Sequence, residues 1–534
     1  MKIRIRDVLI FTSCLLFTSA VYAEPGELWR NGAASFALDL PSIDDRAANI
    51  ARETLKNHMD DFFDVGLPLD NPLASVRIVA GNPQNNPAMA RLVNEGLKLT
   101  NEDLGDEGFQ LLTFETDSRR VLVLFARTPR ALKHSLQELL FFRVRVTAEK
   151  GVAEWPMNVV RTPKIRYRGI YILPCWAQHD SIESWKRVFQ FNSELTLNRC
   201  WFWLDGFPVA GHPAVSHVPG RPTDYDRSPL ASNDAVRSLI ELSNHEEMKF
   251  LIGGGWMNWH HEQVAGKDPI KARNFYLDYL KEFPDIGGFY FEPTGEAAEV
   301  KEWRPEAQSL KDTVETLLSD HSSLEVAIAI GRFNNSEWRK LLSDMDPSRV
   351  FWWWCWGEPH IDNALTQYPS VLGWHTTVQM SAIHGTTSPP RPIDERLAGI
   401  VTSYDPGMGF GNPWNGSATL GGAPGPRNFD PYTMPYFSHE YRYREYCWNT
   451  QITEQEYANR LASRLFDADM PIEAIEYYLK LADYCFRPET ATAVIMKRIE
   501  EFVGQYKYHG TPRNRDTLKR MTEATLGLRK IRGD

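Results

Sequence analysis

Eight short apolar runs recur between residues 167 and 404, separated by segments whose apolar residues have helical spacing. The runs span residues 167–173, 198–204, 248–253, 286–291, 324–330, 350–355, 371–376 and 399–404. Parallel strands need crossover connections and bury both faces, so this alternation predicts a (β/α)8 barrel of the TIM type. Helices are indicated most clearly at 269–283 and 301–319, whereas the proline-rich stretch between the last two runs predicts a loop with a short helix.

Two further parts flank the predicted barrel, and 534 residues are too many for one small core. Before it, strand-like and helical segments alternate in a small α/β unit, without a catalytic constellation. After it come a long loop rich in Gly, Pro and Asn (406–435) and four helical segments. We therefore predict a signal peptide (1–23), an N-terminal α/β domain (24–162), the barrel (163–435) and a C-terminal helical region (436–534).

The first 23 residues have the pattern of an export signal. Lys2, Arg4 and Arg6 precede an apolar run at 8–17, and small residues end at Ala23. The apolar run is too short for a permanent anchor. Cys14 would suit a lipoprotein, but its surroundings match that signal poorly. We expect cleavage after Ala23, a periplasmic or secreted protein, and no stable membrane anchor.

The charge, cysteine and tryptophan content of the chain limits the kinds of ligand and partner that we expect it to bind. A net charge of -10 argues against general nucleic-acid binding. Five cysteines remain after cleavage at spacings unlike a zinc knuckle, so buried thiols are expected, with one disulfide left open. The 17 tryptophans serve either as core residues or as flat platforms for sugar rings. We expect no metal or cofactor, and the oligomeric state stays open.

Two carboxylates follow the fourth run. In Asp285–Glu296, glycines that permit close packing precede Phe-Tyr-Phe, and Pro293 and Gly295 then break the strand around Glu292 and Glu296. Catalytic groups of such barrels lie at the carboxyl ends of the strands. Glycoside cleavage needs one carboxylic acid and one carboxylate opposite it, and Glu358, after the sixth run, is the candidate partner. Glu296 is the expected acid, with Glu292 as the competitor.

Other polar and aromatic side chains follow the remaining runs. Candidates for sugar binding are Asp205, Trp256, His260, His261, Arg332, Trp356, Trp374, Tyr404 and Trp414. Adjacent His260 and His261 lack the spacing of a helical metal site, so we expect them to bind substrate. Arg332 would suit a substrate carboxylate. Because side chains alternate along a strand, part of the Trp352–Trp356 cluster is expected to face outward under the helices. Tyr441 lies in a segment before the C-terminal helices that could reach over the open end of the barrel.

Several strings resemble the superfamily of α-glucuronidases and β-hexosaminidases. In the first unit, Gly108–Leu112, Val121–Arg130 and Ala131–Leu140 follow that family's order of strand, strand and helix. Arg168-Gly-Ile resembles its first barrel strand, and Pro284–Phe289 resembles the fourth strand of α-glucuronidases, whose acid then falls at Glu296. Gly357-Glu358-Pro359 resembles a catalytic Arg-Glu-Pro, although Gly357 replaces the arginine.

The resemblance implies an exported glycoside hydrolase acting on an oligosaccharide or polysaccharide, with uronic-acid-bearing glycans as the first substrate hypothesis. A second hypothesis is a β-N-acetylhexosaminidase-like enzyme, in which the substrate acetamido group is the nucleophile and Glu292 and Glu296 form the pair. A third is a noncatalytic glycan-binding protein. The sugar, the anomeric outcome and exo or endo action stay open.

Overall fold

The computed structural model of the chain divides into two compact units, which are described separately. Unit 1 comprises residues up to 161 with 466–469 and 510–513, and unit 2 comprises the rest. The structure describes residues 24–62, 71, 74–116, 119–172, 182–203, 232–255, 268–292, 304–329, 344–353, 361–375, 393–404, 437–486 and 491–532. The proposed signal peptide lies outside these ranges.

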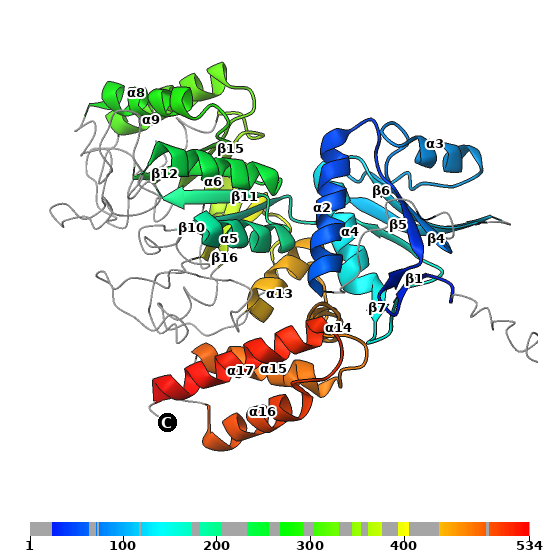
Figure 1. Cartoon of the computed structure of the whole chain (residues 1–534). Helices are drawn as coiled ribbons and strands as arrows, with labels where there is room; N and C mark the ends of the chain where they lie inside the picture. Colours follow the sequence, from blue (N-terminus) through cyan, green and yellow to red (C-terminus); the bar gives the residue numbers. More distant parts are fainter. Residues whose placement is uncertain are drawn as a thin grey trace, which may run out of the picture. The chain divides into compact units, whose positions relative to one another are not determined.

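Unit 1 is built on a five-stranded sheet with helices on both faces (Figure 1). The sheet order is β3 (Phe36–Asp39), β4 (Val76–Gly81), β6 (Arg119–Ala126), β5 (Phe109–Thr116) and β9 (Asn158–Arg161). Helices α2 (Asp45–Phe62) and α4 (Pro129–Glu138) pack together on one face, and α3 (Pro87–Asn94) lies on the other. A separate antiparallel sheet contains β2 (Ala33–Ala34), β1 (Glu27–Arg30), β8 (Lys150–Ala153) and β7 (Val144–Val146).

The central strands of this sheet are apolar on both sides, which explains why helices cover both faces of the sheet. On β6, Val121 and Val123 pack in the cluster that contains Met89 of α3, whereas Leu122 and Leu124 alternate to the opposite face and are also fully buried. The order of strand, strand and helix implied by Gly108–Leu112, Val121–Arg130 and Ala131–Leu140 is found in β5, β6 and α4. After α4 the chain continues in a π-helical turn at Leu139–Arg143.

A buried acid in unit 1 predicts a pH dependence of stability. Asp467 lies in a short segment that hydrogen-bonds to β7 through Ala468 N and Val146 O (2.8 Å). Burial raises the pKa of Asp467 to about 7, which Arg513, with its Nε 3.7 Å from Oδ1, only partly offsets, while Asp469 raises the pKa further. The native state therefore binds more protons than the unfolded chain between about pH 4 and 7.

The free energy of unfolding is consequently expected to fall as pH rises through this window. Asp467→Asn should flatten that slope and make the protein more stable than wild type above pH 7, by at most about 4 kcal/mol. Melting curves of both proteins between pH 5 and 8 check this expectation. Asp106→Asn, at an exposed position of the same unit, is the control. A wild type that gains stability toward pH 8 would contradict the assignment.

Unit 2 contains the closed parallel barrel predicted from the sequence. Eight strands pair in chain order, and the last pairs with the first. They are β10 (Tyr167–Ile172), β11 (Arg199–Trp203), β12 (Lys249–Gly255), β13 (Gly288–Glu292), β14 (Glu325–Ala329), β15 (Val350–Trp353), β16 (Val371–His375) and β17 (Gly399–Tyr404). Crossover helices in the described parts are α5 (Ile182–Glu194), α6 (Asn233–His245), α8 (Pro269–Glu282), α9 (Arg304–Asp320) and α11 (Ile361–Gln367).

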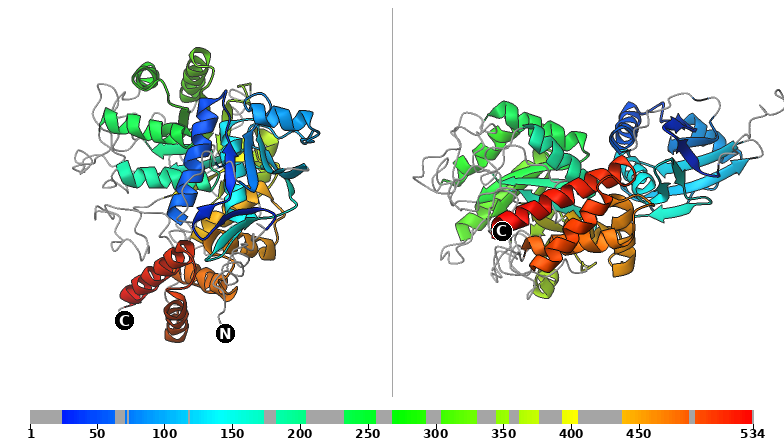
Figure 2. Two further views of the ribbon diagram at one scale, coloured as in Figure 1. Left: turned by 45° about the vertical axis from the view of Figure 1, so that its right-hand side comes forward. Right: turned by 60° about the horizontal axis from the view of Figure 1, so that its bottom comes forward.

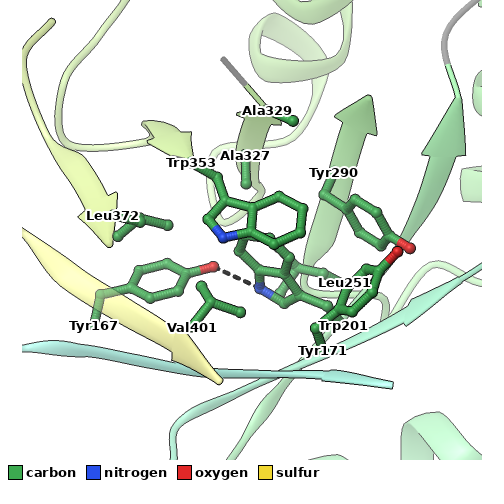
Figure 3. Close-up of a cluster of buried hydrophobic side chains, with 10 residues drawn as sticks. All are labelled: Tyr167, Tyr171, Trp201, Leu251, Tyr290, Ala327, Ala329, Trp353, Leu372 and Val401. Carbon is green, nitrogen blue, oxygen red and sulfur yellow. Dashed lines mark hydrogen bonds between the residues drawn. The ribbon is translucent and has the colours of Figure 1, made fainter. Parts of the chain in front are cut away.

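Alternation along β13 separates the two sides of the barrel wall. Phe289 and Phe291 face outward, where both rings meet Tyr276 of α8 at centroid distances of 5.1 and 4.9 Å. Tyr290 points inward to a cluster of ten buried residues (Figure 3). Gly288 is required at the start of this strand, because a Cβ there would lie 2.0 Å from the carbonyl oxygen of Glu325. The sequence-based expectation that glycine permits close packing at this position is confirmed.

The described residues after the barrel form five helices: α13 (Phe437–Trp448), α14 (Glu454–Leu465), α15 (Glu473–Phe486), α16 (Ala493–Tyr506) and α17 (Pro512–Arg532). Figure 2 shows the last four gathered in a bundle. Helix α13 ends at the amino end of β10, where Cys447 O accepts hydrogen bonds from Lys164 N (2.9 Å) and Ile165 N (3.1 Å). Buried Arg464 of α14 also forms an ion pair with Glu194 of α5.

Candidate active site

Three of the predicted site residues lie in described barrel strands, at or near the carboxyl ends. Glu292 is the last residue of β13. For Trp374 and Tyr404 only the backbone is described, and it lies at or near the ends of β16 and β17. The other predicted site residues lie outside the described ranges: Asp205, Trp256, His260, His261, Glu296, Arg332, Trp356, Glu358 and Trp414. The description of the site is therefore centred on Glu292.

Glu292 is the last residue of the fourth barrel strand. It is partly exposed and pairs with Gly255 at the end of β12. The two strands are fixed closely together, because a Cβ on Gly253 would lie 1.7 Å from the carbonyl oxygen of Tyr290. This close approach fixes the spacing of the two strands that lead to Glu292.

Tyr171 contacts Glu292 from across the barrel. The Tyr171 hydroxyl donates to Glu292 Oε1 at 3.2 Å, although β10 and β13 are three strands apart in the sheet order. Sequence analysis did not single out Tyr171. The available signal was a tyrosine near the end of the first predicted strand, but the pattern alone could not assign it to the interior.

Closely packed aromatic rings fill the barrel interior around the Tyr171 ring (Figure 3). Tyr171 packs against Tyr290 (5.6 Å between centroids) and Trp353 (5.3 Å), and Trp201 stacks on Tyr290 at 5.3 Å. Trp352 lies on the outer side against Tyr368, so the expected split within the tryptophan cluster is confirmed for these two residues. The described interior tryptophans are core residues under the site.

A charged cluster closes the amino end of the barrel. Glu325 of β14 accepts from Arg199 Nη2 of β11 and Lys249 Nζ of β12, each at 2.7 Å. Burial raises the pKa of Glu325, but the two cations outweigh this effect and leave the pKa below its ordinary value. The Arg199 guanidinium also lies 4.6 Å from the Tyr167 ring centroid. This cluster is separated from the carboxyl end by the aromatic layers and is structural.

The described residues contain no group of His, Cys, Asp and Glu arranged to hold a metal ion. Among the same residues, no helix is long and apolar enough to span a membrane. At this end of the barrel the described residues provide the partly exposed carboxylate of Glu292 and the buried Tyr171 hydroxyl that donates to it. Closely packed aromatic side chains fill the interior next to them. Such a carboxylate can accept a proton, stabilise developing positive charge or attack an electrophilic carbon.

No protein-family model and no curated protein sequence matches the chain. Solved structures do match its fold. CpGH84B aligns with 88% of this chain and 77% of its own length at 10% identity, with a TM-score of 0.53. CpGH84D aligns over 87% and 74% at 11% identity and a TM-score of 0.52. The chitobiase of Flavobacterium johnsoniae aligns over 89% and 73% at 13% identity and a TM-score of 0.51.

The chain has the fold of these glycoside hydrolases. The predicted architecture is thereby confirmed, with an α/β region, a TIM barrel and terminal helices in one chain. In this fold β13 is the fourth barrel strand, as the resemblance of Pro284–Phe289 implied. Glu292 accordingly stands at the end of the fourth strand, in the part of a barrel where catalytic side chains are found.

Proposed function

We propose that the chain is an exported glycoside hydrolase that cleaves glycans carrying N-acetylated amino sugars. The observation that carries this proposal is Glu292, partly exposed at the end of the fourth barrel strand and hydrogen-bonded to Tyr171. Similarity to the fold of a chitobiase supports the substrate class. This favours the β-hexosaminidase-like hypothesis over the α-glucuronidase-like one.

The proposed reaction uses the pair Glu292 and Glu296, which are four residues apart in the sequence. The acetamido oxygen of the substrate attacks C1 and forms a C1–O bond, while the glycosidic C1–O bond breaks and its oxygen takes a proton from the acidic member of the pair. Water then attacks C1, returns its proton to that residue and opens the cyclic intermediate. The anionic member stabilises the positive charge that develops on the acetamido group.

A uronic-acid-bearing glycan is the second candidate substrate. Pro284–Phe289, which resembles the fourth strand of α-glucuronidases, leads directly into the fourth strand of this barrel. In that case Glu296 would be the acid and Glu358 the base or nucleophile, and Arg332 would bind the substrate carboxylate.

Hydrolysis of a panel of aryl glycosides and native polysaccharides separates these candidates. We expect release from N-acetylhexosaminides and inhibition by a thiazoline analogue of the cyclic intermediate. Glu296→Gln should lower the rate about 10²- to 10⁴-fold, and Glu358→Gln much less. Loss of rate in both variants on uronosides alone would favour the second candidate. Glycan binding without any product would favour the noncatalytic alternative.

Export is a separate part of the proposal, based on residues 1–23. The mature protein from the producing cell is expected to begin at Glu24. A chain that keeps Met1 in the soluble intracellular fraction would contradict it.

A further inference from the structure

A row of aromatic side chains joins α15 to α16, two helices of the C-terminal bundle (Figure 2). The Tyr477 ring of α15 lies 4.5 Å from the Phe502 ring of α16, and the Phe502 ring lies 4.9 Å from that of Tyr506, measured between centroids. The His509 ring continues the row at 5.4 Å from Tyr506. Phe502 is buried, whereas the other three side chains are partly exposed. The row therefore has a packed base and faces solvent.

Tyr508 projects from the turn that follows α16. His509 N donates to Tyr506 O at 2.7 Å, which holds residues 506–509 in a compact turn. Tyr508 is 81% exposed, the largest value among the exposed large apolar side chains of the described residues. Lys507 Nζ lies 4.9 Å from the centroid of its ring. We name as the aromatic strip the side chains of Tyr477, Phe502, Tyr506, Tyr508 and His509.

The aromatic strip combines apolar ring faces with accessible polar groups. Within the part of the chain that the structure describes, the hydroxyls of Tyr477, Tyr506 and Tyr508 form no hydrogen bond with another residue. Lys480 of α15 places its Nζ 5.8 Å from the Tyr477 ring centroid, so ammonium groups lie beside two of the tyrosines. Tyrosines at a wet surface offer a flat apolar face and a polar tip to the same ligand.

A sugar chain has the complementary chemistry. Each pyranose ring presents C–H groups on its faces, which stack on aromatic rings, and oxygen atoms around its edge. Tyrosine hydroxyls can donate to or accept from those oxygens, and lysine ammonium groups can donate to hydroxyl and acetamido oxygens. Because the rings are spread over two helices and a turn, the aromatic strip suits an extended polymer better than a single sugar.

A second protein fits the aromatic strip less well. A stable protein interface buries about 800 Å² on each partner and has few lysines in its core. The strip is made of a few rings, and Lys480 and Lys507 lie directly beside them. A narrow surface of this kind is sufficient for a single polymer strand.

We propose that the aromatic strip is a glycan-binding surface that holds a polymer of N-acetylated amino sugars on helices separate from the barrel strand that carries Glu292. The identity of the sugar rests on the proposed function, whereas the stacking surface does not. A polymer bound at the strip keeps its other units at a raised local concentration around the same chain.

Tyr508→Ala tests the aromatic strip at small risk to folding, because the side chain is almost fully exposed. Retardation in native gels that contain glycol chitin measures the binding. We expect the dissociation constant to rise about 5-fold in Tyr508→Ala and about 25-fold when Tyr477→Ala is added. Most of the binding should persist in about 0.5 M sodium chloride, which screens charge but not stacking.

Leu526→Ala is the matched control. Leu526 is another exposed apolar side chain of the bundle, fourteen residues after the first residue of α17 and thus about 21 Å along that helix. Its dissociation constant for glycol chitin should stay within about twofold of wild type. The proposal is wrong if wild type does not bind glycol chitin, if Tyr508→Ala binds as tightly as wild type, if Leu526→Ala weakens binding equally, or if salt abolishes the binding.

Two further measurements identify other roles for the aromatic strip. A change of oligomeric mass in Tyr508→Ala, measured by sedimentation velocity, would make the strip a contact between copies and overturn the proposal. An equal fall in the hydrolysis of a small aryl glycoside would place the strip in the reaction site and overturn it as well. Wild type that binds glycol chitin through the strip but hydrolyses no glycoside would support this surface and count against the proposed function.

Discussion

Substitution of Glu292 by glutamine is expected to lower kcat/KM by about 1,000-fold, the largest effect on activity among the described residues. The amide keeps the size of the side chain but carries no negative charge, so the positive charge that develops in the transition state loses its partner. The effect should fall mainly on kcat, because the interaction strengthens as charge develops. Steady-state kinetics on the best aryl glycoside measures it.

Asp285→Asn is the matched control for this change. Asp285 is exposed and precedes the same strand at its amino end, so its charge is remote from the mouth. Its kcat/KM should stay within about twofold of wild type, as expected for a surface substitution. Retention of wild-type kcat in Glu292→Gln would remove Glu292 from the reaction and leave Glu296 and Glu358 as the pair to test.

Glu325→Gln is expected to produce the largest loss of stability, about 3 kcal/mol. The amide leaves Arg199 and Lys249 without their shared counter-charge at the amino end of the barrel, where Glu325 is only 6% exposed. Because Lys249 is partly exposed, water compensates it in part, which keeps the loss near the lower end for broken buried pairs. Denaturant unfolding of the folded barrel measures the loss.

The pH dependence of this loss has a definite sign. The folded pKa of Glu325 is lowered, so its ionised form contributes stability above pH 4.5, and that contribution is lost as pH falls through the folded value. The stability gap between wild type and Glu325→Gln should therefore be full at pH 7 and shrink below about pH 4.5. Glu315→Gln, which removes an exposed carboxylate 3.7 Å from Lys311 Nζ, is the control and should cost under about 0.5 kcal/mol. An equal loss in both variants would contradict the assignment.

The barrel was predictable because its signal is local and repeated. Each strand is a short run such as Phe289–Phe291 that is apolar on both sides, and helical spacing follows most runs. Parallel strands covered on both faces require that composition. The same logic predicted that Glu292 follows the fourth strand, since Pro293 cannot continue it as a central strand.

The inward or outward direction of each side chain was not predictable. When both faces of a strand are apolar, alternation gives two sides without saying which one is the interior. Trp352 and Trp353 are adjacent and equally apolar, yet one packs under Tyr368 and the other belongs to the central cluster. For this reason the sequence could not distinguish the two tryptophans, whereas the structure places Trp352 on the outside of the barrel wall and Trp353 in the interior.

The sequence by itself determined the eight strands, their order and the acids that follow them, because those properties belong to short contiguous segments. Only the tertiary structure decided which distant side chains meet. Closure of the sheet brings Tyr171 to Glu292, 121 residues away, and brings Arg199, Lys249 and Glu325 together from three strands. The physical reason is that barrel closure fixes strand register and curvature collectively, and neither quantity is encoded in any one segment.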